Sequence, residues 1–312
     1  MTPFFYLHAE GSGLSHFLHE HLGSFGEFLY EVIIEALFDT LKLLPFLFLT
    51  YVLMEYIEHK QSDKLRSALM KSGSWGPLAA GALGALPQCG FSVMAANLYT
   101  GGIVGAGTLI AVFLSTSDEM LPLLLAGNIP WGKALLIVLY KAAVGIFAGF
   151  LVNFLLKIAR KERKPINIDE LCEEAGCDCE SGILRSAIRH TVSVTLFVLI
   201  FTLLLNCALF LVGEGIEKFS VDIPFVSHLF CALIGLIPNC AASVALTKLA
   251  LSGVISSGAM LAGLFSGAGV GLAVLFRVNK RVKENLFIVL ALVLFGTLFG
   301  MIADLIPFLT LT

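Results

Sequence analysis

The 312-residue sequence has few charged residues, with Asp, Glu, Lys and Arg making up 14% of it. A soluble protein carries about a quarter charged residues, so an ordinary globular domain is excluded. No stretch is basic enough to indicate a nucleic-acid partner. The sequence also lacks a C-x-x-C pair and a G-x-x-x-x-G-K-[ST] motif. We therefore expect neither a thiol-redox enzyme nor an ATPase, and no cofactor.

Hydrophobic residues are abundant instead, at 57% of the chain, and the mean hydropathy is +0.90. The apolar stretches reach about 20 residues or more, which suits helices in a lipid bilayer and is too long for barrel strands. We therefore predict an all-α polytopic membrane protein. Six segments are expected to span the membrane: residues 33–57, 103–126, 132–157, 190–212, 254–276 and 286–308.

Two further apolar segments, residues 77–99 and 228–252, lie in an internal repeat with an offset of 151. Both contain the motif P-x-C-x-x-S-V. The identical pairs are Gly84/Gly235, Pro87/Pro238, Cys89/Cys240, Ser92/Ser243, Val93/Val244, Leu98/Leu249, Gly102/Gly253, Gly107/Gly258, Ala111/Ala262 and Ser115/Ser266. Matched helix breaks in two halves of a membrane protein are typical of a transporter's binding site.

Basic residues concentrate in three connections, which the positive-inside rule places in the cytoplasm. They are Lys60, Lys64, Arg66 and Lys71; Lys157, Arg160, Lys161, Arg163, Lys164, Arg185 and Arg189; and Arg277, Lys280, Arg281 and Lys283. The first two connections are both placed in the cytoplasm, so the chain between them must cross the membrane an even number of times. Three apolar segments lie between them, so one of the three does not cross. We therefore predict that residues 77–99 form a re-entrant hairpin from the cytoplasm, and residues 228–252 one from outside.

This count gives two inverted repeats, each with three transmembrane helices and one hairpin, or about ten hydrophobic segments. The domains expected are an external N-terminal segment (1–30), a first repeat (31–157), a cytoplasmic loop (158–187), a second repeat (188–308) and a short tail (309–312). Both termini would lie outside. The alternative is that both segments cross as kinked helices and one loop breaks the charge rule.

The hairpin tips offer the same chemistry twice: a proline, an amide, a cysteine and a serine. A cysteine in the first turn of the returning half-helix would favour its thiolate form, which binds soft metals and metalloids. The candidate substrate-binding residues are Gln88, Cys89, Ser92, Asn239, Cys240 and Ser243. The competing interpretation is that small residues and cysteines only pack helices closely here.

Ionisable residues inside apolar segments are costly and often functional. Asp39 lies in the first span and aligns with His190 at the offset of 151. Asp118 and Glu119 lie in the span 103–126, where the second half has Gly269 and Val270, and Lys141 is a candidate counter-charge. The candidate coupling residues are Asp39, Asp118, Glu119 and His190, and the candidate metal ligands are Cys89, Cys240, Asp39 and Asp118.

Two clusters outside the spans could also hold metal. His16, His19 and His21 lie in the N-terminal segment, and Cys172, Cys177 and Cys179 lie among acids in the cytoplasmic loop. Three cysteines so close together could capture a thiophilic ion, although an exposed, acidic, variable loop in a reducing cytosol is the favoured explanation. For the histidines too, the interpretation without metal is favoured.

The duplicated P-x-C-x-x-S hairpins, the D-T-L-K-L-L-P stretch at 39–45 and the E-Y-I-E-H stretch at 55–59 carry a family resemblance. Over about residues 30–308 the chain resembles the ten-transmembrane heavy-metal exporter family, which is related to arsenical permeases and often labelled as manganese transporters. The resemblance implies an efflux transporter. Arsenicals would suit the cysteines, whereas manganese would suit Asp39 and Asp118.

We therefore predict a secondary-active efflux permease of the cell inner membrane, embedded in the lipid bilayer and working by alternating access around the two tips. A heavy-metal or metalloid ion would be its substrate and a proton its coupling ion, with a homodimer as a possible assembly. The alternative is a transporter of a small anionic organic solute bound at the half-helix N-termini.

Overall fold

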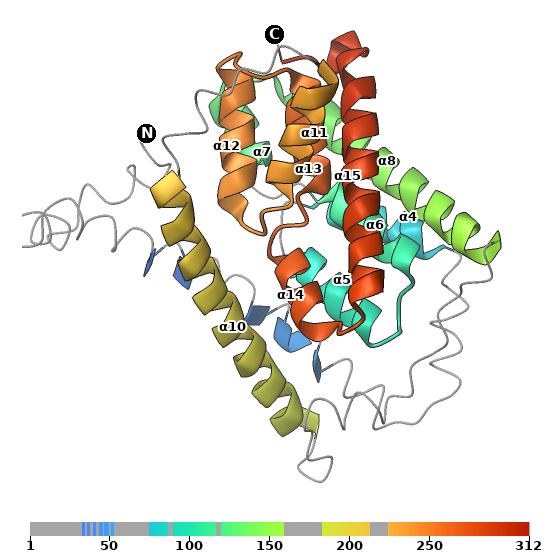
Figure 1. The fold of residues 1–312 in the computed structure, drawn as a ribbon, viewed down its shortest axis with the longest axis vertical. Coiled ribbons are helices and arrows are strands. Elements are labelled where there is room, and N and C mark those ends of the chain that lie inside the picture. The colour runs from blue at the N-terminus through green and yellow to red at the C-terminus, as the bar shows by residue number, and fades with distance from the viewer. Residues whose placement is uncertain are drawn as a thin grey trace, which may run out of the picture.

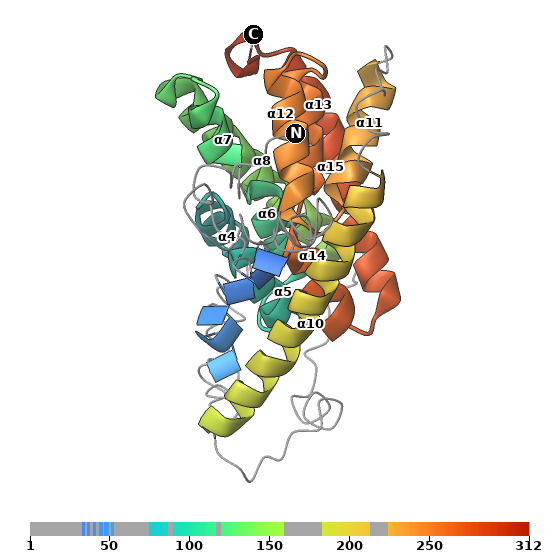
Figure 2. The same cartoon turned by 90° about the vertical axis from the view of Figure 1, so that its left-hand side faces the viewer.

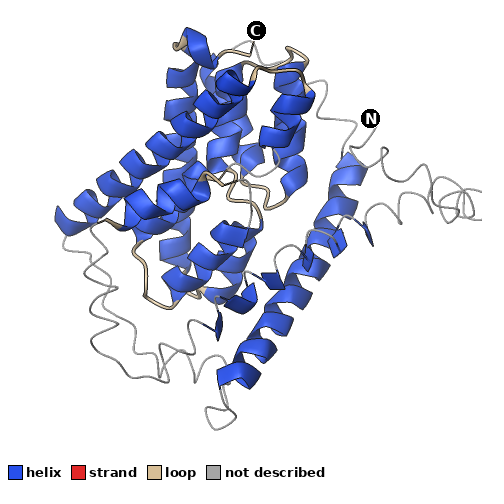
Figure 3. Ribbon diagram, turned by 180° about the vertical axis from the view of Figure 1, so that it is seen from behind, coloured by secondary structure: helices blue, strands red, loops and turns tan. Residues whose placement is uncertain are grey.

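The chain folds into a bundle of α-helices. The computed structural model describes residues 75–86, 90–116, 120–158, 183–212 and 224–311, with scattered positions between 33 and 52. These residues form helices and connecting loops, without strands (Figure 3). The elements are α4 (Gly76–Gly84), α5 (Gly90–Thr100), α6 (Ala106–Ser115), α7 (Met120–Ala126), α8 (Trp131–Ile158), α10 (Ile183–Val212), α11 (Pro224–Gly235), α12 (Cys240–Leu251), α13 (Ser257–Ser266), α14 (Val270–Val278), α15 (Val282–Asp304) and the 3-10 turn η4 (Pro307–Leu309).

Five stretches of the described residues are long and apolar enough to cross a membrane. They are Ala106–Ala126, Trp131–Ile158, Ala187–Leu204, Ser257–Val278 and Val282–Asp304. The predicted spans 132–157, 190–212 and 286–308 are confirmed as the unbroken helices α8, α10 and α15. The span predicted at 33–57 lies partly outside the described residues, and the positions described there are helical.

The spans predicted at 103–126 and 254–276 are interrupted, which the sequence reasoning did not anticipate. Helix α6 ends at Ser115, and Thr116 has an extended ψ of 128°. Helix α13 ends at Ser266, and Gly269 has a positive φ of 53° before α14 begins. The first break coincides with the polar run at residues 115–119, and the second with Gly267 and Gly269.

The helix breaks expected around the P-x-C motifs are present. Helix α4 ends at Gly84 and α5 begins at Gly90, while residues 87–89 lie outside the described part. In the second half α11 ends at Gly235 and α12 begins at Cys240. The turn between them is closed by the Asn239 amide, which donates to the Ile237 carbonyl oxygen at 2.7 Å.

The repeat of 151 residues extends to the secondary structure. Shifting the bounds of α6, residues 106–115, by this offset gives residues 257–266, which are the bounds of α13. The loops before these helices also match, because Gly102 and Gly253 have φ values of 71° and 75°. A left-handed backbone strongly favours glycine, so these two residues are explained by the same turn made twice.

Each half packs its helices in the same way. Helix α6 packs against both α4 and α8, and α13 packs against both α11 and α15. Glycines allow the close approach: a Cβ on Gly84 would overlap the hydroxyl of Ser115, and one on Gly235 would overlap the carbonyl of Gly263. Small residues at such crossings are how membrane helices gain van der Waals contact.

The two halves exchange contacts. Helix α5 of the first half packs against α14 of the second, and α12 of the second half packs against α7 of the first. The long helix α10 lies along one side of the bundle (Figures 1 and 2). It is held to α14 by Arg277, whose guanidinium donates to the Ser193 hydroxyl at 2.9 Å and lies 4.4 Å from the centre of the Phe197 ring.

Candidate functional site

The interrupted helices α6 and α13 end beside one buried lysine. Lys141, in α8, is fully buried. Its ammonium donates to the carbonyl oxygen of Thr116 at 2.5 Å and to that of Leu264 at 2.8 Å. The ammonium also lies 5.8 Å from the centre of the Phe265 ring. One cation thus joins the ends of a helix from each half.

The backbone explains why a lysine is stable at this depth. The last four carbonyls of a helix have no partner within the helix, and they give its C-terminal end a partial negative charge. Thr116 directly follows α6, and Leu264 lies in the last turn of α13. Two such ends beside one ammonium offset part of the free-energy cost of burying its charge.

Serine hydroxyls next to this point repeat in both halves. Ser115 and Ser266 are fully buried at the last residues of α6 and α13. Each donates to the carbonyl oxygen four residues earlier, Ala111 at 2.7 Å and Ala262 at 3.2 Å. Such a bond offers a serine an acceptor inside an apolar environment.

Four of the predicted tip residues are described. Ser92 is fully buried and lies against α14 of the other half, since a Cβ on Gly271 would come within 2.7 Å of the Ser92 Cβ. Asn239 and Cys240 are buried at the turn before α12 and at its first residue. Ser243 is half-buried on the same helix. Gln88 and Cys89 lie outside the described residues.

His190 is the only predicted coupling residue with described contacts, and it is half-buried on α10. Its ring stacks on that of Tyr51 from the first span, with centroids 5.5 Å apart. The Tyr51 hydroxyl donates to the Asn97 side-chain oxygen on α5 at 3.3 Å. His190 is thus connected through Tyr51 to α5, the helix that follows the first P-x-C motif.

Asp39, Asp118 and Glu119 lie outside the described residues, but their neighbours are informative. The hydroxyls of Thr40 and Thr191 donate to the carbonyls of Ala36 and Ala187, both at 2.7 Å. The offset of 151 therefore relates equivalent helical positions directly after Asp39 and His190.

Thr116 and Met120, which flank the Ser117–Asp118–Glu119 stretch, are both buried. These acids therefore follow within three residues of a carbonyl that accepts from Lys141.

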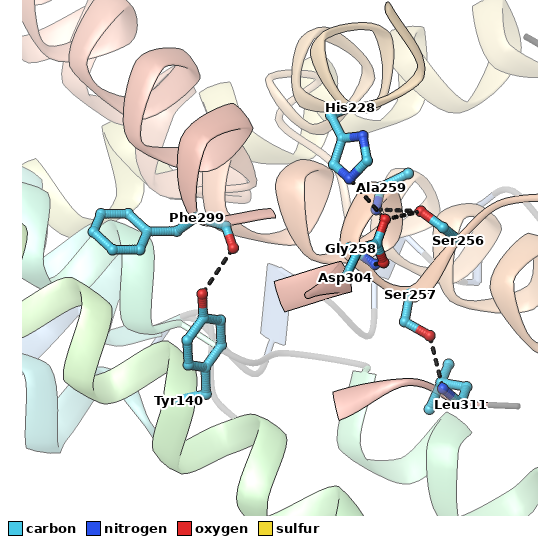
Figure 4. Close-up of polar contacts among 9 residues, drawn as sticks. All are labelled: Tyr140, His228, Ser256, Ser257, Gly258, Ala259, Phe299, Asp304 and Leu311. Atoms are coloured by element: carbon cyan, nitrogen blue, oxygen red, sulfur yellow. Dashed lines mark hydrogen bonds and ion pairs between the residues drawn. The ribbon is translucent and has the colours of Figure 1, made fainter. Parts of the chain in front are cut away.

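The sequence reasoning missed a second charged cluster, formed by His228 of α11 and Asp304 of α15 (Figure 4). The His228 Nε2 lies 3.0 Å from an Asp304 carboxylate oxygen, and His228 is nearly fully buried. The same carboxylate accepts from the Ser256 hydroxyl at 2.6 Å and from the Gly258 amide at 2.5 Å. Asp304 thus caps the N-terminal end of α13, where a negative charge is favourable.

The first half has a neutral version of this cap. The Gly107 amide of α6 donates to the Asn153 side-chain oxygen at 3.2 Å. Asn153 and Asp304 are related by the offset of 151, as are Gly107 and Gly258. This alignment within the predicted spans was the signal that could have revealed Asp304.

No group of three or more His, Cys, Asp or Glu side chains forms a metal-sized cluster among the described residues. Of the four predicted metal ligands only Cys240 is described; Cys89, Asp39 and Asp118 are not. The histidines 16, 19 and 21 and the cysteines 172, 177 and 179 also lie outside the described part.

Comparison with known families supports the resemblance recognised from the motifs. Residues 29–180 match the family described as "Putative, 10TM heavy-metal exporter". The matched residues make up slightly less than half of the chain. No curated protein and no solved structure matches it.

The exporter-family match covers the first span, the first P-x-C motif, Lys141 and most of the connecting loop. It is shorter than the stretch 30–308 over which the motifs carry the resemblance. The matched family is described as one of heavy-metal exporters, and the five long apolar stretches of the described residues agree with a multi-pass membrane protein.

Proposed function

We propose that this chain is a secondary-active efflux permease for a heavy-metal or metalloid ion of the manganese or arsenic type. The observation that carries the proposal is the pair of interrupted helices, at matched positions in both halves, which end together at Lys141. Irregular backbone at membrane depth occurs where it is buried in protein or lines a substrate cavity. A purely structural bundle would need no such paired breaks.

The contacts support a first re-entrant hairpin made by α4 and α5. Gly76, at the start of α4, lies against Thr108 in the first turn of α6. Helix α5 ends at Thr100, only a short loop before α6 begins at Ala106. Both ends of the broken segment therefore lie at the same end of α6, as a hairpin requires.

The second broken segment has the same arrangement. His228, near the start of α11, is bound to Asp304, which caps the start of α13. Helix α12 ends at Leu251, shortly before α13 begins at Ser257. Both ends of this segment therefore lie at the start of α13.

Two contacts support opposite orientations for the hairpins. The Tyr99 hydroxyl at the end of α5 donates to Glu284 at 3.0 Å, beside the basic connection 277–283 that the charge rule places in the cytoplasm. Leu251 at the end of α12 lies against Gly127, in the loop that the same rule places outside. The proposed topology has inverted repeats at 31–157 and 188–308, joined by a cytoplasmic loop at 158–187, with both termini outside the inner membrane.

In the proposed mechanism the two tips form the substrate site. Cys89 and Cys240 ligate the ion as thiolates, and Gln88, Asn239, Ser92 and Ser243 complete its shell. Asp39, Asp118, Glu119 and His190 carry protons, with Asp39 and Asp118 as additional oxygen ligands for a harder metal. Access alternates between the two sides, driven by a proton gradient, and a homodimer is a compatible assembly.

A second candidate is a transporter of a small anionic organic solute. The observation that favours it is the buried ammonium of Lys141, together with α12, which begins at the buried Cys240. A buried cation and a helix N-terminus both attract anions.

Uptake into inverted membrane vesicles separates the two candidates. We expect accumulation of one or more single metals or arsenite, increased by a pH gradient, and no accumulation of carboxylates. The double variant Cys89→Ser with Cys240→Ser should lose this uptake, whereas Cys231→Ser, which changes a buried cysteine away from the tips, should keep it. Unchanged metal uptake in the double variant would contradict the ligand role, and carboxylate uptake alone would favour the second candidate.

A further inference from the structure

We infer that Lys141 carries the coupling charge of the transporter: as an ammonium it holds α6 and α13 together, and it must lose its proton before a cationic substrate occupies the site. The inference rests on the proposed function. It assigns a coupling role to a residue that the motif analysis treated only as a counter-charge.

The position of the ammonium supports this role. It bonds to a carbonyl at the end of one interrupted helix from each half, Thr116 and Leu264. Two helix C-termini that point at one place make a site favourable for a cation. In this structure the cation of that site is a side chain fixed to α8.

The charge is present in one half only. The position equivalent to Lys141 at the offset of 151 is Leu292. Leu292 carries no charge, and its backbone carbonyl accepts a hydrogen bond from the Ser266 hydroxyl at 3.3 Å. Because only one half has this ammonium, the loss or gain of a proton at Lys141 would change the charge between the two halves at one residue only.

The elements around Lys141 offer few other charges. Helices α4, α6, α7 and α13 and the turn η4 contain no titratable side chain. Helix α15 has Lys283, Glu284 and Asp304 near its two ends, far along the helix from Leu292. Tyr140 is next to Lys141 and donates to the Phe299 carbonyl at 2.8 Å (Figure 4). Asp118 and Glu119, outside the described residues, are the acids nearest to Thr116 in the chain.

Electrostatics then links the proton to the substrate. Gly84 and Gly235, which end the helices before the two tips, lie against Ser115 and Gly263 beside the ends bound by Lys141. A cation held at the tips would therefore be repelled by the ammonium in a low-dielectric environment. When Nζ gives its proton to water on the side to which the site is open, the neutral amine loses its attraction to the carbonyl ends. A metal cation can then approach, and reprotonation after its release restores the bridge, so proton and metal move in opposite directions.

The test compares two transport modes in vesicles: export of the transported metal driven by a pH gradient, and metal-for-metal exchange at equal pH. The variants are Lys141→Met, which removes the charge at similar length, and Lys141→Arg, which keeps a charge that does not leave at accessible pH. Lys133→Met, near the start of the same helix, is the matched control.

We expect gradient-driven export to fall about tenfold or more in both Lys141 variants. Lys141→Met has no charge to exclude the metal and should keep exchange within about twofold of the wild type, whereas the permanent charge of Lys141→Arg should reduce exchange about tenfold or more as well. A purely structural cap predicts otherwise: Lys141→Arg would restore both modes, or Lys141→Met would lose exchange together with export, and either result overturns the inference. Should Lys141→Met not fold, Lys141→Arg alone decides, because retention of either transport mode in that variant overturns the inference. Absence of metal transport in the wild type would overturn the proposed function itself, and the inference with it.

Discussion

The two helix caps at Asn153 and Asp304 allow a quantitative prediction, because one neutral and one charged side chain do the same task at equivalent positions. Replacing Asp304 with alanine removes the acceptor for Ser256, Gly258 and His228 together. Replacing it with asparagine leaves the side-chain oxygen that the first half uses at Asn153.

The magnitudes follow from the bonds lost. Hydrogen bonds to a charged group contribute about 1.5–3 kcal/mol, and neutral ones about 1 kcal/mol. The Asp304 side chain is 29% exposed, so water replaces part of each interaction. We expect a loss of unfolding free energy of about 2–4 kcal/mol for Asp304→Ala, about 1–2 for Asp304→Asn and about 1 for Asn153→Ala.

The assay is the midpoint of thermal unfolding in detergent, followed by helical circular dichroism at one pH for all variants. The expected order of destabilisation is Asp304→Ala first, then Asp304→Asn, with Asn153→Ala the least. Equal losses for the two Asp304 variants would refute the reasoning, because they would mean that the retained oxygen does not cap Gly258. His228→Ala should approach Asp304→Asn, since both break the pair between His228 and Asp304.

Two further predictions concern packing and topology. Gly235→Ala should lower the free energy of unfolding by about 2 kcal/mol or more, because its Cβ would meet the backbone of Gly263. The control Gly132→Ala has nothing within 4 Å of its Cβ and should be neutral or slightly stabilising. Midpoints of thermal unfolding compare the two variants. Gly101 and Ser252 are equivalent positions in the repeat, and each can be replaced by cysteine. In intact cells an impermeant thiol reagent should label Ser252→Cys. The same reagent should label Gly101→Cys only after permeabilisation. Labelling of both in intact cells would contradict the inverted arrangement.

Much of the helix layout could be predicted from the sequence. The offset of 151 relates the bounds of α6 and α13, and the hydropathy located α8, α10 and α15 to within several residues. The breaks near Pro87 and Pro238 were predictable because proline lacks an amide hydrogen and interrupts helical bonding. These features are local, so the chain near each point is sufficient to predict them.

The centre of the site was not predictable in the same way. The partners of Lys141 are backbone carbonyls, and every residue has one, so no sequence pattern indicates which will accept. The polar run at 115–119 and the glycines at 267 and 269 coincide with the interruptions after α6 and α13, but they do not indicate which side chain the two helix ends will meet. His228 and Asp304 are brought together by packing between α11 and α15, distant in sequence.

The exchange of contacts between the halves has a mechanical consequence. Because α5 rests on α14 while α12 rests on α7, a rigid rotation of one half against the other would separate both interfaces at once. Each half therefore restrains the other, and a bend inside one half would disrupt fewer helix contacts than a rotation between the halves. Residues 267–269 provide such a joint, since Gly269 already holds a backbone conformation that other residues avoid. We expect the moving parts of this protein to be single helices that swing about these joints, within a frame formed by α8 and α15.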